Sequence, residues 1–145
     1  DKKTAAPEKD KAVPNSSQYK YQKDELAAFC HFGPNTFTGK EWGDNYGDTD
    51  PNQLFTLKEN FDAETLVKTI KEAGFKKLII TAKHHDGFCL WNSEYTTYDV
   101  ASTDYAKKNY DNMGGDILAE ISAACTKEDI DMGLYLSPWD IHEPK

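Results

Sequence analysis

The chain has 145 residues, of which 38% are hydrophobic and 12% are aromatic, and its formal net charge is -8 at pH 7. This length suffices for one domain with a hydrophobic core, and the acidic charge argues against binding nucleic acid, which requires a basic surface. No apolar stretch approaches the roughly 18 residues that a membrane-spanning helix needs, so we expect no membrane span.

The first 17 residues form a polar segment with hardly a large apolar side chain, and Pro7 and Pro14 would interrupt any helix. We expect residues 1–17 to be a disordered lead-in and residues 18–145 to form the folded unit. The chain begins with Asp1 instead of Met, as it would after removal of a leader. We therefore expect an exported protein, either periplasmic or extracellular.

A first buried strand is predicted over residues 26–32, which are mostly apolar and are followed by Gly33 and Pro34. Residues 18–25 are expected to lead into it as a turn or a short helix. Phe29 and His31 share one face of this strand, because side chains alternate along a strand. A lone histidine in such a place is more often structural than functional, unless other polar groups converge on it.

A long loop and a helix are expected next. Residues 33–60 are rich in Gly, Asn, Asp and aromatic residues, and a loop this long in a compact domain is usually functional. The helix is predicted to begin at the N-cap Asp62, with Phe61 and Leu66 as a hydrophobic staple, and to close at Gly74.

The same order then repeats around a central strand. An apolar, β-branched run at residues 77–82 predicts a strand buried on both faces, and it changes abruptly into a polar and aromatic loop over residues 83–113. A second helix is expected from the N-cap Asp116, and a third strand at residues 132–136 runs into the sequence Ser-Pro-Trp-Asp at 137–140. The three cysteines are expected to be buried free thiols, since they are odd in number and form no close pair: Cys30, Cys89 and Cys125.

Strands that alternate with helices predict a parallel sheet joined by right-handed crossovers. Both long loops follow strands, whereas the returns from helix to strand are short, and this asymmetry is typical of a (β/α)8 TIM barrel. A complete barrel needs about 250 residues. We therefore expect an α/β fold that is the amino-terminal portion, about three βα units, of such a barrel. The remainder, in the same chain or a partner chain, is needed to close the fold and to cover its apolar inner face.

Polar and aromatic residues from all three strand ends are expected on one rim of this sheet: His31, Glu41, Trp42, His84, His85, Asp86, Trp91, Tyr135 and Trp139. No histidine pair has the spacing of a helical zinc site, and the consecutive His84 and His85 would point in opposite directions on an extended strand. We therefore expect no metal and no cofactor. Imidazoles, a carboxylate and tryptophan faces together suit recognition of a sugar, whose hydroxyls need polar partners and whose ring face needs an apolar surface.

Three segments in this order also resemble a known family. They are HFGPNTFTGKEWG at 31–43, TAKHHDGFCLW at 81–91 and YLSPWD at 135–140. They closely resemble the glycoside hydrolases of family 29, the retaining α-L-fucosidases, and in particular the branch that prefers α-1,3/1,4-linked fucose. The resemblance implies an exo-acting hydrolase whose partner is a fucosylated glycan or glycoconjugate.

The resemblance also implies roles for individual residues. Those that match fucose-binding positions are His31, Glu41, Trp42, His84 and His85, with Tyr135 matching less securely, and Phe29 could line a pocket for the methyl group of the sugar. The family's nucleophile and acid/base are expected beyond Lys145, so this chain carries no catalytic residue and is expected to be inactive alone. Glu41, Asp86 and Asp140 are chemically able to act as such a pair, but they are interpreted as binding or loop-ordering groups.

Two alternatives remain open at this stage. A carbohydrate-binding module without turnover uses the same aromatic and hydroxyl-pairing groups. In an ordinary structural α/β domain, by contrast, the two adjacent histidines would be satisfied within the core and would not respond to fucose.

Overall fold

The structure is a computed structural model that describes residues 12–42, 50–108 and 115–143. Its strands form one parallel sheet in the order β1-β2-β3. The strands are β1 (Ala27–Cys30), β2 (Lys77–Lys83) and β3 (Asp131–Leu136). The helices are α1 (Ser16–Asp24), α2 (Pro34–Thr38), α3 (Pro51–Leu54), α4 (Ala63–Glu72), the 3-10 helix η1 (Val100–Ser102), α5 (Asp104–Lys108) and α6 (Ile117–Glu128).

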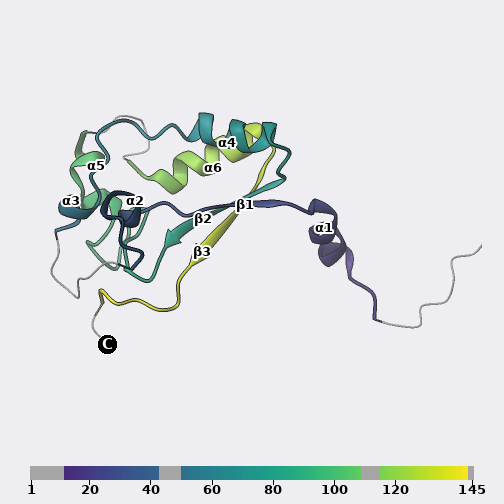
Figure 1. Cartoon of the computed structure of the whole chain (residues 1–145), viewed down its shortest axis with the longest axis horizontal. Helices are drawn as coiled ribbons and strands as arrows, with labels where there is room; N and C mark the ends of the chain where they lie inside the picture. Colours follow the sequence, from purple (N-terminus) through teal and green to yellow (C-terminus); the bar gives the residue numbers. More distant parts are fainter. Residues whose placement is uncertain (1–11, 43–49, 109–114, 144–145) are drawn as a thin grey trace, which may run out of the picture.

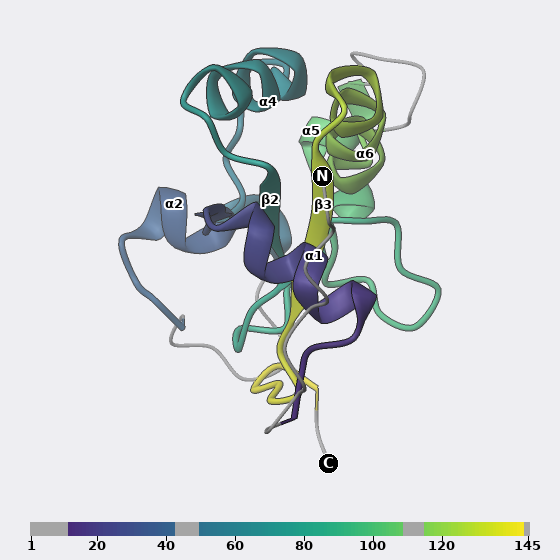
Figure 2. The same cartoon turned by 90° about the vertical axis from the view of Figure 1, so that its right-hand side faces the viewer.

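The helices divide between one face and the two ends of the sheet. Figure 1 shows α4 and α6 together on one face, and Figure 2 shows them side by side above the strands. The short helices α2, α3 and α5 gather where the strands end, while α1 lies at the opposite, amino-terminal end (Figure 1). The predicted parallel α/β arrangement is confirmed, and the loops that follow β1 and β2 lie together at one end of the sheet.

Side-chain caps begin both long helices where the sequence predicted them. The Asp62 carboxylate accepts a hydrogen bond from the Thr65 backbone N–H at 2.9 Å, and that of Asp116 accepts one from Ala119 at 2.9 Å. Each cap satisfies an amide that has no partner within the first helical turn. These two helices connect the strands and so set the parallel order of the sheet.

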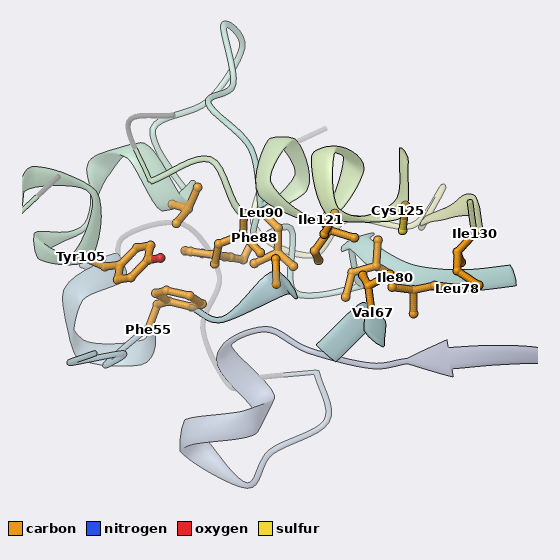
Figure 3. Close-up of a cluster of buried hydrophobic side chains, with 14 of the residues drawn as sticks. Phe55, Val67, Leu78, Ile80, Phe88, Leu90, Tyr105, Ile121, Cys125 and Ile130 are labelled. Carbon is orange, nitrogen blue, oxygen red and sulfur yellow. The ribbon is translucent and has the colours of Figure 1, made fainter. Parts of the chain in front are cut away.

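The hydrophobic core fills the space between the sheet and α4 and α6 and continues toward the strand ends (Figure 3). On the sheet side, Leu78 and Ile80 of β2 are fully buried, and Val67 and Ile121 face them from the two helices. Further along, the ring of Phe88 stacks on that of Phe55, with centroids 5.2 Å apart. The loop that follows β2 is therefore anchored in the core, which fixes the polar residues that precede Phe88.

Element boundaries differ from the predictions in places. The strand predicted at 26–32 is only β1, Ala27–Cys30, because the next residues pair with a side chain instead of a strand. The Phe32 N–H donates to the Thr81 hydroxyl at 3.0 Å, and that hydroxyl donates to the Phe32 carbonyl at 2.9 Å. Helix α1 begins at Ser16, two residues inside the segment predicted as a lead-in. Residues 1–11 lie outside the described part of the chain.

The predicted burial of the cysteines holds for two of them. Cys89 and Cys125 are buried free thiols, whereas Cys30 is only partly buried. Burial raises the pKa of the Cys89 thiol to about 12.

The central strand was predicted to be buried on both faces, but only one face is fully covered. Leu78 and Ile80 point toward the helices and are inaccessible, while Ile79 on the opposite face is partly exposed. Large apolar side chains of the neighbouring strands are more than half exposed: Phe29 at 56%, Leu134 at 58% and Leu136 at 60%. Several large apolar side chains exposed close together are uncommon on a folded protein and typically mark a surface that contacts other protein.

Candidate functional site

Imidazole and phenol rings meet where the three strands end. His31 follows β1, the pair His84 and His85 follows β2, and Tyr135 lies near the end of β3. The ring centroid of His84 lies 4.4 Å from that of His31, 4.3 Å from His85 and 5.8 Å from Tyr135. His84 is thus the centre of a group of rings contributed by every strand of the sheet.

Two tryptophans and a phenylalanine extend this group. The ring of Trp42 lies 5.7 Å from His85 and 5.5 Å from Trp139, and His85 lies 5.0 Å from Trp139. Phe29 contacts Tyr135 edge-on at 5.8 Å. We call the whole set the ring cluster: Phe29, His31, Trp42, His84, His85, Tyr135 and Trp139.

The ring cluster contains almost every site residue predicted from the sequence. Glu41 contributes no ring, but its charge acts on His84. His84 and His85 would point in opposite directions only on an extended strand. The strand ends at Lys83, and their ring centroids lie 4.3 Å apart. Trp91, expected on the same rim, makes no ring contact with the cluster in the part of the chain that the structure describes.

The environment of His84 favours a neutral imidazole. Partial burial lowers its pKa, and the neighbouring His31 and His85 lower it further, while Glu41 opposes the shift. A neutral imidazole has one donor and one acceptor nitrogen. His84 is therefore suited to pairing with hydroxyl groups, which both donate and accept.

The Ser-Pro-Trp-Asp segment after β3 supplies Trp139, which was expected on the rim, and Ser137, which was not predicted to be a site residue. Trp139 joins the ring cluster, and the Ser137 hydroxyl lies 2.6 Å from the Nδ1 atom of His85. Both tryptophans keep an accessible surface, with Trp42 46% and Trp139 47% exposed. The position of this segment directly after a predicted strand was the signal that could have identified Ser137.

The acidic residues near the cluster are engaged by other groups. Asp140 forms an ion pair with Lys83 at 2.8 Å, and Asp86 is buried and accepts the backbone N–H of Phe88 at 3.1 Å. Burial acts to raise the pKa of Asp140, but the hydrogen bonds and the charge of Lys83 outweigh it, so the net shift is downward. The ion pair of Asp140 with Lys83 connects the loop that follows β3 to the end of β2.

Asp86 gives the fold a pH dependence. Burial, followed by the charge of Asp140, raises its pKa from 3.8 to about 6 in spite of the Phe88 N–H. The folded state therefore binds this proton more tightly than the unfolded state, so stability falls as pH rises between about 4 and 6.

We expect the substitution Asp86→Asn to remove the loss of stability with rising pH, because asparagine keeps an oxygen for the Phe88 N–H but does not titrate. Relative to wild type, the free energy of unfolding of the variant should increase between pH 4 and pH 7, by at most about 3 kcal/mol. Denaturant unfolding of the full-length protein at both pH values measures the difference. A difference that does not change with pH would contradict the expectation.

Other kinds of site are not found in the described ranges. Within residues 12–42, 50–108 and 115–143, no group of three or more His, Cys, Asp or Glu side chains is arranged to hold a metal ion. None of the helices described is long and apolar enough to cross a membrane.

Comparison with known proteins identifies similar sequences over almost the whole chain. A family model described as alpha-L-fucosidase matches residues 11–145. Alpha-L-fucosidase 1 of Arabidopsis thaliana is 47% identical over 131 residues, which cover 90% of this chain and 24% of the plant protein. A putative alpha-L-fucosidase 1 of Oryza sativa is 44% identical over 132 residues, again 24% of its length. The chain thus spans about a quarter of the length of these relatives.

Solved structures show the same relationship. A GH29 fucosidase of Ruminococcus gnavus in complex with fucose is 65% identical and superimposes with a TM-score of 0.84, covering 97% of this chain and 27% of that protein. A putative alpha-L-fucosidase of Bacteroides ovatus is 53% identical with a TM-score of 0.79, covering 90% of this chain and 21% of that protein. The described fold therefore corresponds to one part of these larger structures.

Proposed function

The chain belongs to the alpha-L-fucosidase family, and from this premise we propose that it forms the amino-terminal part of the catalytic domain of a retaining exo-α-L-fucosidase. The substrate class is a glycan or glycoconjugate that ends in α-linked L-fucose. Within that enzyme, the chain provides much of the pocket for fucose. The observation that carries the proposal is the convergence of three histidines and two tryptophans at one end of the sheet.

The polar and apolar groups of the ring cluster match those of fucose. Fucose presents three ring hydroxyls beside the anomeric carbon and one methyl group, so a pocket needs several directional polar contacts and an apolar patch. His31, His84 and His85 supply the polar contacts, with Glu41 beside them. Phe29, against Tyr135 at 5.8 Å, supplies an apolar surface suited to the methyl group.

Bond cleavage requires residues outside this chain. A retaining glycosidase uses two carboxyl groups about 5 to 5.5 Å apart, one as nucleophile and one as acid/base. Asp86 and Asp140 are held by the contacts described above, and Glu41 matches a sugar-binding position. The chain spans only 24% of its curated relatives, which leaves ample length for both catalytic groups elsewhere. The 145 residues alone are therefore expected to be inactive.

The remainder of a (β/α)8 barrel would also cover the exposed apolar side chains of the sheet. Phe29 on β1 and Leu136 on β3 are 56% and 60% exposed here. Further strands beside β1 and β3, with their helices, would bury such side chains and pair the free strand edges. Export from the cytoplasm and a preference for α-1,3/1,4-linked fucose remain predictions from the sequence.

The direct experiment is hydrolysis of 4-nitrophenyl α-L-fucopyranoside by the full-length protein, with the matching β-L-fucoside and α-L-rhamnoside as controls. Turnover of the α-fucoside alone, with the α-anomer of fucose as first product by NMR, is the expected result. Binding of fucose without turnover of any fucoside would favour the alternative, a carbohydrate-binding module. Hydrolysis by the isolated 145-residue chain would overturn the assignment of the catalytic pair to other segments.

A further inference from the structure

Ser137 makes three short contacts with atoms of the site. Its Oγ atom lies 2.6 Å from His85 Nδ1 and 2.6 Å from the Trp139 carbonyl oxygen, and it accepts the Trp139 backbone N–H at 3.1 Å. The residue is only 2% exposed, so water does not compete for these contacts. This hydroxyl is thus enclosed by three partners.

The identity of these partners determines where the protons lie. A carbonyl oxygen cannot donate, so the contact of 2.6 Å between Ser137 Oγ and the Trp139 oxygen must contain the single hydroxyl proton. The Oγ atom then has only lone pairs left, and one of them accepts the Trp139 N–H. The contact with His85 must therefore be donated by the imidazole, through a proton on Nδ1.

The serine itself is held rigidly against the end of β2. Its backbone N–H donates to the Lys83 carbonyl at 2.9 Å, and the Ile141 N–H donates to the His85 carbonyl at 3.0 Å. The loop after β3 is thus bonded to the loop after β2 on both sides of the His85 contact. His84 differs, because its Nδ1 atom is buried and has no hydrogen-bond partner within the described residues.

We propose that Ser137 is a positioning residue that holds His85 as the Nδ1–H tautomer and presents its Nε2 lone pair to the ligand. The role of His85 toward the ligand rests on the proposed function. In a fucose pocket, the Nε2 atom of His85 accepts a hydrogen bond from one sugar hydroxyl. The same serine fixes the backbone of Trp139, whose ring lies 5.0 Å from that of His85. One buried hydroxyl therefore sets both the proton position of the imidazole and the placement of the neighbouring indole.

The tautomer can be observed directly in the full-length protein without any sugar. Histidine labelled with 15N at both ring nitrogens distinguishes a protonated Nδ1 with a bare Nε2 from the reverse arrangement, and the His85 signals are assigned with His85→Gln. We expect a protonated Nδ1 in neutral His85. A neutral His85 protonated at Nε2 would overturn it, whether or not the protein hydrolyses fucosides.

The role of the serine is tested with Ser137→Ala and the matched control Ser93→Ala, whose hydroxyl accepts the backbone N–H of Tyr95 and hydrogen-bonds with the Cys89 thiol. Ser137→Ala should lose the fixed tautomer and reduce kcat/KM for 4-nitrophenyl α-L-fucoside about 10-fold, and Ser93→Ala should change neither. An unchanged tautomer in Ser137→Ala would contradict the positioning role. If that variant does not fold, the wild-type tautomer still decides the inference. A protonated Nδ1 in a protein without fucosidase activity would reject the proposed function and leave the tautomer assignment standing.

Discussion

His84→Ala should reduce kcat/KM of the full-length protein for 4-nitrophenyl α-L-fucoside about 100-fold or more. The His84 ring lies within 6 Å of three other members of the ring cluster, with centroid distances of 4.4, 4.3 and 5.8 Å. Its removal would eliminate a hydrogen bond to the sugar and leave a hole in the wall of the pocket. The lost hydrogen bond and the lost packing together, about 3 kcal/mol, correspond to roughly a 100-fold effect.

The fourth histidine offers a matched control. His142 lies outside the ring cluster and stacks on Tyr98, with centroids 3.9 Å apart and planes only 4° from parallel. His142→Phe keeps a ring in this stack and should leave kcat/KM within about threefold of wild type. Equal losses in the two variants, or no loss in a folded His84→Ala protein, would show that the ring cluster does not bind the reacting sugar.

Gly87→Ala should lower the free energy of unfolding by about 2 to 5 kcal/mol, since it combines two unfavourable effects. Gly87 has a φ of +84°, a left-handed conformation that costs other residues about 1 to 2 kcal/mol. A Cβ atom there would also lie 2.5 Å from Asp140 Oδ1 and 2.8 Å from His142 Cβ. The segment 140–142 would have to move, and with it the adjoining Trp139.

Gly74 separates these two effects. It has a similar φ of +90°, but a Cβ atom added there meets nothing within 4 Å. Gly74→Ala should therefore cost only the conformational part, about 1 to 2 kcal/mol, and should not change activity. Denaturant unfolding of both variants in the full-length protein gives the comparison. Equal losses of stability would show that the loop after β3 does not pack against Gly87 as described.

The features that were predicted correctly depend on residues that are close together in the sequence. Asp62 and Asp116 cap their helices as expected, because an aspartate before an amphipathic segment satisfies amides within its own first turn. The central strand was also placed correctly, within one residue at its carboxyl end. Alternation of strands and helices was then enough to give a parallel sheet.

The features that could not be predicted depend on contacts between residues that are far apart in the sequence. The predicted end of the first strand was wrong because the Thr81 hydroxyl, 49 positions away, takes over the hydrogen bonds of Phe32. The adjacent placement of the His84 and His85 rings could not be predicted, because it depends on where β2 ends and on Ser137, which follows β3 and contacts His85. No periodicity within the sequence encodes such pairings, since each depends on the register of neighbouring strands.

The most direct test of the proposed fucose pocket is a crystal structure of the full-length protein with L-fucose bound. We expect the sugar in the ring cluster, with hydroxyl oxygens within hydrogen-bonding distance of His31, His84 and the Nε2 atom of His85, and its methyl group near Phe29. Fucose bound elsewhere, with the ring cluster closed by other segments of the protein, would contradict it.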